Sequence, residues 1–206
     1  DGSSIRKLDR LCNRINHKEN FYIEDFYLKN DQIELAFDDL KYDTNKSNNA
    51  LITNITCISP YANLIKIPSV KLIINDDSIT VPDTNIFMQN SKLVFKADIM
   101  NYLNNNLTFN ALLTGFVNSR DIKKLENQST RYPLNINLNG NKFNQNLFVQ
   151  LLLEKTDIFD DPSVINLSSK IEKKGIKIED LSLTSFFGTF SNDFKSYCNR
   201  FCICFR

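Results

Sequence analysis

The hydrophobic pattern of the chain is clearest between residues 77 and 117, where short alternating segments are separated by polar turns. In an extended strand, residues two apart share a face. In the first segment, one face carries Leu93, Phe95, Ala97 and Ile99, and the other carries mainly Lys92, Lys96 and Asp98. After a polar turn at residues 104–106, the apolar face continues with Leu107, Phe109, Ala111, Leu113 and Val117. The two segments predict a β-hairpin with one apolar face.

The same period of two occurs on both sides of this hairpin. Residues 21–43 predict a second hairpin, residues 50–75 supply two or three further strands, and residues 164–188 predict a hairpin with its turn at residues 173–175. The cleanest alternation sets Leu134, Ile136 and Leu138 against Asn135, Asn137 and Asn139. The pattern predicts a mostly β fold, an antiparallel meander of repeated hairpins.

Two architectures suit so many one-faced strands. In a closed β-sandwich the apolar faces meet, whereas in a long curved, groove-like sheet the apolar face lines the groove. The closed core is the commoner solution, so the residues alone favour the sandwich. Residues 147–153 are apolar on both faces, which predicts a strand covered on both sides.

Three local signals modify the strands. Pro60, Pro68 and Pro82 predict breaks in strand pairing or positions at a sheet edge. Residues 23–28 and 178–183 each contain an Ile-Glu-Asp sequence that shifts the apolar face by one residue, which predicts a β-bulge in each. Residues 119–126 predict a short helical segment.

A well-formed helical pattern occurs only at the start of the chain. After a cap at Ser3 or Ser4, a single stripe collects Ile5, Leu8, Leu11, Cys12 and Ile15. Such a helix packs on the end of a sheet or, less commonly, lies on an anionic membrane. We therefore expect a short amphipathic helix at residues 1–19, a β-rich domain at residues 20–190 and a disordered tail at residues 191–206.

Composition narrows the choice of partner. The 206 residues carry 25 basic and 24 acidic side chains, a net charge of +1, so no global field selects nucleic acid. Five cysteines are an odd count that predicts no disulfide framework. No run of about 18 apolar residues and no signal-peptide pattern occurs. We expect the chain to be a piece of a longer protein.

Catalytic and metal-binding patterns are absent from the sequence. It contains no nucleotide-binding loop, no nucleophile motif and one histidine, His17. The acidic pairs Asp38-Asp39, Asp76-Asp77 and Asp160-Asp161 fall at predicted turns, where solvated structural roles are common. Cys198, Cys202 and Cys204 lack a fourth metal ligand nearby. We expect no enzyme activity, no cofactor and no metal.

Four segments carry a resemblance to a known family. They are VPDTNIFMQNSKLVFKADI, LTFNALLTGFVNSRDIKKL, RYPLNINLNG and INLSSKIEKKGIKIEDLSLTSFFGTFS, which lie within residues 81–191. Over roughly residues 20–190 the chain resembles the AsmA and TamB superfamily of bacterial envelope proteins. The resemblance implies a curved β-groove in the periplasm, anchored to the inner membrane through segments not present in this chain.

The implied function is non-enzymatic. A protein of this kind binds phospholipid or another acyl-chain ligand and conducts it between membranes, or assists outer-membrane assembly together with envelope proteins. The groove residues that the resemblance favours are Leu93, Phe95, Ile99, Leu107, Phe109, Leu113, Leu134, Ile136 and Leu138. In a closed fold the same residues are ordinary core.

Two other hypotheses remain open at this point. One is an adhesin-like β-sandwich or solenoid module that binds another protein through its surface. The other is an enzyme with an unrecognised site, which would require a deep polar pocket that gathers Asp38, Asp76 and Asp160.

Overall fold

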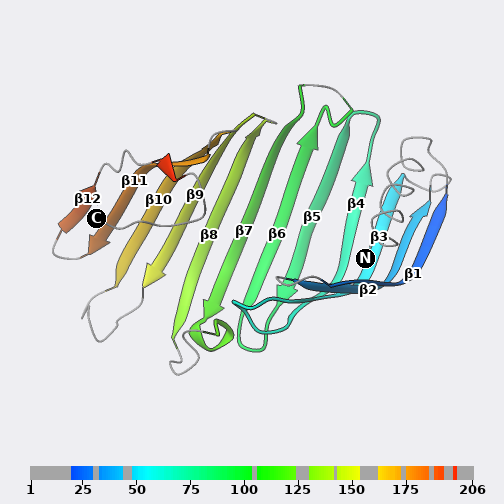
Figure 1. The fold of residues 1–206 in the computed structure, drawn as a ribbon, viewed down its shortest axis with the longest axis horizontal. Coiled ribbons are helices and arrows are strands. Elements are labelled where there is room, and N and C mark those ends of the chain that lie inside the picture. The colour runs from blue at the N-terminus through cyan, green and yellow to red at the C-terminus, as the bar shows by residue number, and fades with distance from the viewer. Residues whose placement is uncertain are drawn as a thin grey trace.

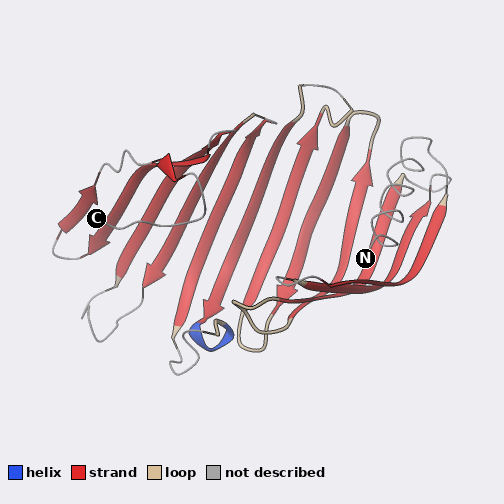
Figure 2. Ribbon diagram, in the orientation of Figure 1, coloured by secondary structure: helices blue, strands red, loops and turns tan. Residues whose placement is uncertain are grey.

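The described part of the chain folds as one continuous β-sheet in the computed structural model (Figure 1). The structure describes residues 20–29, 33–43, 48–103, 106–123, 130–141, 143–153, 162–172, 175–185, 188–192 and 197–198. Figure 2 shows a single layer of strands, with helical structure in the described part confined to the short 3-10 turn η1 (Ser119–Asp121).

The strands follow one another in space as they do in sequence. Every neighbouring pair is antiparallel, and the order runs from β1 to β12 with β13 pairing to β11. Their bounds are β1 (Phe21–Lys29), β2 (Glu34–Asp43), β3 (Asn49–Ile58), β4 (Ile65–Ile74), β5 (Ser78–Phe87), β6 (Lys92–Met100), β7 (Thr108–Asn118), β8 (Arg131–Asn141), β9 (Asn144–Leu153), β10 (Ser163–Glu172), β11 (Gly175–Ser185), β12 (Gly188–Asn192) and β13 (Tyr197–Cys198).

The predicted fold class is confirmed: the protein is mostly β, and the sheet is an open antiparallel meander. The closed-sandwich alternative is wrong for the described residues, because they form one sheet and no second sheet packs against it. The sheet is curved, with β1, β2 and β3 turned away from the plane of β5 to β9 (Figure 1). The alternation predicted these strands, because short polar turns between alternating segments favour pairing between sequence neighbours.

A small hydrophobic core lies over the first strands of the sheet. Leu40, Tyr42, Ala50 and Ile74, from β2, β3 and β4, form a cluster in which no side chain is more than 5% exposed. Ile79 and Tyr102 pack against this cluster from the side of β5 and β6. The fully buried part of the apolar surface is therefore concentrated at one side of the sheet.

The two predicted bulges have different outcomes. In β11 the prediction is confirmed, because Ser168 pairs with Asp180 and Ser169 pairs with Ile178, which leaves Glu179 as the extra residue. In β1 it is wrong, because the register with β2 continues unshifted past the acidic pair. At this position Asp25 has a φ of 50°, a left-handed conformation that Asp tolerates better than most residues.

The prolines interrupt pairing as predicted. Pro68 lies in β4 and Pro82 in β5, and the ladder between these strands is reduced to Lys66 with Phe87 at one end and two neighbouring pairs at the other. A proline has no N–H to donate, which accounts for the gap. On its other side, β5 has a bulge against β6 between Val81 and Thr84.

The remaining predictions concern strand β9, the helical segment at residues 119–126 and the two ends of the chain. Strand β9 is not covered on both sides, because Phe148 is 38% exposed. Of the short helical segment predicted at residues 119–126, the structure shows the turn Ser119–Asp121. The predicted helix at residues 1–19 lies outside the described residues, as does most of the tail, of which Ser191, Asn192 and Tyr197–Cys198 are in strands.

Candidate functional site

The feature that stands out in the described part is a continuous apolar face on β6 to β11. Residues that are paired across neighbouring strands project from the same face of a sheet. One apolar row crosses all six strands and consists of Phe95, Leu113, Ile136, Val149, Leu167 and Leu181. At about 4.8 Å between strands, this row extends over about 24 Å.

Parallel rows widen this surface. The row on one side consists of Leu93, Gly115, Leu134, Leu151, Ile165 and Leu183, and the row on the other consists of Ala97, Ala111, Leu138, Leu147, Ser169 and Ile178. Ile99 and Phe109 begin a further row. We call the surface made by these rows the apolar face.

The structure brings together the residues that the resemblance favoured. Eight of the nine project from the apolar face: Leu93, Phe95, Ile99, Phe109, Leu113, Leu134, Ile136 and Leu138. Leu107 lies one residue before β7 and takes no part in the recorded ladder. Whether these residues bind a ligand stays a prediction.

The sequence interpretation missed the part of the apolar face on β9, β10 and β11. Alternation was visible there, but residues 147–153 are apolar at every position except Gln150, so the pattern did not show which side chains face which way. The strand pairing shows which side chains of β9 lie on the apolar face, because Val149 pairs with Ile136 and Leu167.

Side chains of the apolar face are half-buried by one another and are not covered by a second layer. Leu93 and Ala97 of β6 are buried at 6% and 8% exposure. From β7 to β11, no hydrophobic side chain whose burial is described is fully buried. In an ordinary core such residues would be closely packed on both sides, so this face is open within the described structure.

The opposite face of the same strands is largely polar, and we call it the polar face. One of its rows consists of Thr114, Asn135, Gln150, Asn166 and Ser182. Gln150 Nε2 donates to Asn166 Oδ1 at 3.0 Å, and Asn146 Nδ2 donates to Asn139 Oδ1 at 3.2 Å. The sheet therefore separates an apolar surface from an amide-rich one.

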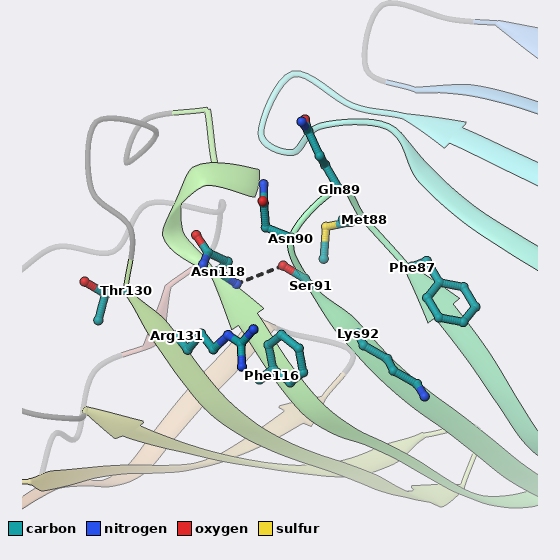
Figure 3. A pocket seen from close by; sticks show the side chains of 10 residues that line it. All are labelled: Phe87, Met88, Gln89, Asn90, Ser91, Lys92, Phe116, Asn118, Thr130 and Arg131. Atoms are coloured by element: carbon teal, nitrogen blue, oxygen red, sulfur yellow. Dashed lines mark hydrogen bonds between the residues drawn. The ribbon is translucent and has the colours of Figure 1, made fainter.

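A second candidate site lies at the end of the polar face where the β5–β6 and β7–β8 turns meet (Figure 3). It is an open pocket of about 840 Å³, which we call the end pocket. Its lining consists of Phe87, Met88, Gln89, Asn90, Ser91, Lys92, Phe116, Asn118, Thr130 and Arg131. No acidic side chain lines it, so it does not gather Asp38 or Asp76, and Asp160, the third residue of the enzyme hypothesis, lies outside the described residues.

A buried carboxylate fixes the walls of the end pocket. Asp121 is 0% exposed and accepts hydrogen bonds from Asn90 N at 2.8 Å, Asn90 Nδ2 at 3.1 Å and Ser91 Oγ at 2.5 Å. Ser91 Oγ in turn accepts from Asn118 N at 2.8 Å (Figure 3). Buried polar groups are stable when they are hydrogen-bonded in this way, so the two turns are held together rigidly.

The β3–β4 loop joins the same network. Asn63 N donates to Asp121 O, and Asn63 Nδ2 donates to Arg120 O, both at 2.9 Å. Lys123 Nζ donates to Ser59 O at 2.7 Å. Loops from three hairpins are therefore tied at one end of the sheet.

The perturbed titratable groups lie away from both candidate sites. The Tyr22 hydroxyl donates to the Asp39 carboxylate, and this bond raises the pKa of Tyr22. The hydrogen bond from Lys170, at 2.9 Å, lowers the pKa of Glu179. Burial raises the pKa of the Cys57 thiol, which disfavours the thiolate that a nucleophile needs. None of these groups lines the end pocket.

Three further findings concern metal sites, membrane-spanning helices and similarity to known proteins. The described residues contain no cluster of His, Cys, Asp and Glu that could hold a metal ion. Within the same residues, no helix has the length and apolar character needed to cross a membrane. Comparisons of the chain with family models, curated proteins and solved structures found no match. What defines the class of this protein is its open single-layer β-sheet with one apolar and one polar face.

Proposed function

We propose that this chain is part of a non-enzymatic carrier that binds acyl chains along the apolar face of its sheet. The observation that carries the proposal is the set of apolar rows on β6 to β11, which no second layer covers. Contiguous exposed apolar surface is unfavourable in water and usually marks a binding site. Its chemistry fits a ligand that is itself apolar and extended.

Acyl chains suit this surface better than a compact ligand. The rows run across the strands for about 24 Å without an interruption by charge. Each CH₂ group that leaves water contributes about 0.8 kcal/mol, so a long chain laid on the face gains affinity along its whole length. The polar face keeps the other side of the sheet compatible with water.

The resemblance to the AsmA and TamB superfamily supports a specific setting for this activity. In that setting the ligand is phospholipid, the full-length protein is periplasmic and anchored to the inner membrane, and the groove carries lipid between membranes or assists outer-membrane assembly. The open, curved sheet is compatible with such a groove.

Leu112 and Leu113 provide a matched test of this proposal. They are neighbours in β7, both are half-buried, and they project from opposite faces. Leu113 lies between Phe95 and Ile136 on the apolar face, whereas Leu112 lies between Lys96 and Asn137. In Leu113→Asp the new carboxylate would stand in the path of the acyl chain, but in Leu112→Asp it would stand beside a lysine.

The measurement is a titration of detergent-free protein with a fluorescent fatty acid, together with native mass spectrometry for co-purified lipid. We expect Leu113→Asp to weaken fatty-acid binding by about tenfold or more and to lose co-purified lipid. Leu112→Asp should change binding by less than about twofold. Circular dichroism checks that both variants fold. Equal binding by the two variants, or no lipid bound to the unmodified chain, would refute the proposal and favour a protein-binding surface.

A further inference from the structure

We propose that the end pocket binds a phosphate-bearing group through Lys92 and Arg131. This site is separate from the apolar face, because its lining strand residues project from the polar face and from the turns beyond it. The inference therefore does not depend on the acyl-chain proposal.

The first observation is the pair of cations. Lys92 and Arg131 are both exposed, and neither makes an ion pair with the described residues. Each lies over an aromatic ring: Lys92 Nζ is 5.8 Å from the Phe87 ring centre, and Arg131 Cζ is 4.8 Å from the Phe116 ring centre. Ring contacts of this kind position a cation without neutralising its charge.

The second observation is that the ladder brings these cations to one place. Lys92 of β6 pairs with Phe116 of β7, and Arg131 of β8 pairs with Asn118, two residues further along β7. Two strand spacings and the offset of two residues along the strand place their backbones about 12 Å apart. Both long side chains border the same pocket, with Phe116 between them (Figure 3).

The third observation concerns neutral donors. Thr130 and Gln89 line the pocket and supply a hydroxyl and an amide. Asn118 is 7% exposed, and its Oδ1 accepts from Arg120 N at 3.0 Å, which leaves its Nδ2 without a partner among the described residues. Phosphate oxygens accept several hydrogen bonds at once, and arginine binds them with two parallel donors.

No acidic side chain among the described residues forms an ion pair with Lys92 or Arg131. Asp121 is the acidic side chain in contact with its walls, and both of its carboxylate oxygens are occupied by Asn90 and Ser91. The nearest acids along β5 and β6 are Asp83 and Asp98, about 13 Å and 20 Å along the strands from Phe87 and Lys92. Strands β7 and β8 contain no acidic residue.

A volume of about 840 Å³ admits more than an inorganic phosphate ion. The bound group is therefore a phosphate ester, either free in solution or in the headgroup of an anionic lipid. Both sources present the same chemistry to Lys92 and Arg131, and the experiment distinguishes them.

The test uses the whole chain and three single variants. Lys92→Gln and Arg131→Gln each remove one cation from the pocket, and Lys96→Gln removes an exposed lysine from the same face of the same strand outside the pocket. Calorimetry measures the binding of inorganic phosphate and glycerol 3-phosphate. Flotation measures binding to vesicles of phosphatidylcholine, with and without phosphatidylglycerol.

We expect saturable binding that weakens about tenfold in Lys92→Gln and Arg131→Gln and less than about twofold in Lys96→Gln. If the two pocket variants lose binding of the soluble phosphates, the ligand is a free phosphate ester. If they lose binding only to phosphatidylglycerol vesicles, the ligand is a lipid headgroup. Leu113→Asp should retain phosphate binding, which separates this site from the apolar face. An equal effect of all three glutamine substitutions, or no binding of inorganic phosphate, glycerol 3-phosphate and phosphatidylglycerol vesicles alike, would overturn the proposal.

Discussion

At the scale of single residues, Gly115 shows how closely the strands of the apolar face approach one another. Its φ is 138°, a conformation that side chains with a Cβ rarely adopt. A Cβ built at this position would lie 2.3 Å from the Lys92 carbonyl oxygen and 2.8 Å from Leu93 Cα. Because both contacts are with backbone, a side chain here could be accommodated only by moving β6 away from β7.

We therefore expect Gly115→Ala to destabilise the sheet by at least about 1–3 kcal/mol, from backbone strain alone. Thr114→Ala is the matched control on the same strand and should cost about 1 kcal/mol or less. The free energy of unfolding from urea titration provides the comparison. Equal stability of the two variants would show that β6 and β7 are not held at this separation.

At the end pocket, the sequence did not predict which residues lie close together. Lys92 and Phe116 were visible as members of strands, but nothing in their local pattern places Arg131 beside them. That proximity follows from the β7–β8 register and from the bonds of Asp121 to the β5–β6 turn, which join positions about 30 residues apart. A period-two pattern contains no information on such contacts.

At the scale of elements, strands and their order could be predicted because alternation is local. The hairpins predicted within residues 21–43, 92–117 and 164–188 all form, and in each the two strands pair with one another. Alternation does not distinguish an open sheet from a sandwich, because the same one-faced strands serve both. The bulge at Glu179 was predictable from the shifted apolar face, whereas the same pattern at Asp25 occurs with a left-handed residue and no register shift.

Strand β5 has an interrupted hydrogen-bond ladder to each of its neighbouring strands. Its ladder to β4 is interrupted between the Lys66–Phe87 and Ile73–Thr80 pairs, and its ladder to β6 has a bulge after Val81. Strand β7, in contrast, is paired without a break to both β6 and β8. Backbone amides without a ladder partner open to water more readily.

Hydrogen–deuterium exchange tests this difference between the two strands. We expect peptides from the middle of β5 to exchange faster than peptides from the middle of β7, with the contrast strongest around Pro82 and Asp83. The ends of β5 provide an internal control, since they retain partners on β4. Uniform protection along both strands would contradict the expectation that the interrupted pairing of β5 lets its amides open to water.

At the scale of the whole molecule, the two faces of one sheet suggest two kinds of contact. The apolar face offers rows of aliphatic and aromatic side chains for an acyl chain, and the end pocket on the other side offers two cations. The sequence showed that an apolar face exists, but only the three-dimensional pairing shows that it extends from β6 to β11 and remains uncovered by the described residues.

The central claim, that this open face binds acyl chains, can be tested by site-specific photocrosslinking. A photoreactive amino acid is placed at position 113 in one protein and at position 112 in another, and each is expressed in bacterial cells, irradiated and analysed by mass spectrometry for lipid adducts. We predict a lipid adduct at position 113, between Phe95 and Ile136, and little or none at position 112. Adducts at neither position, or equal adducts at both, would contradict the account.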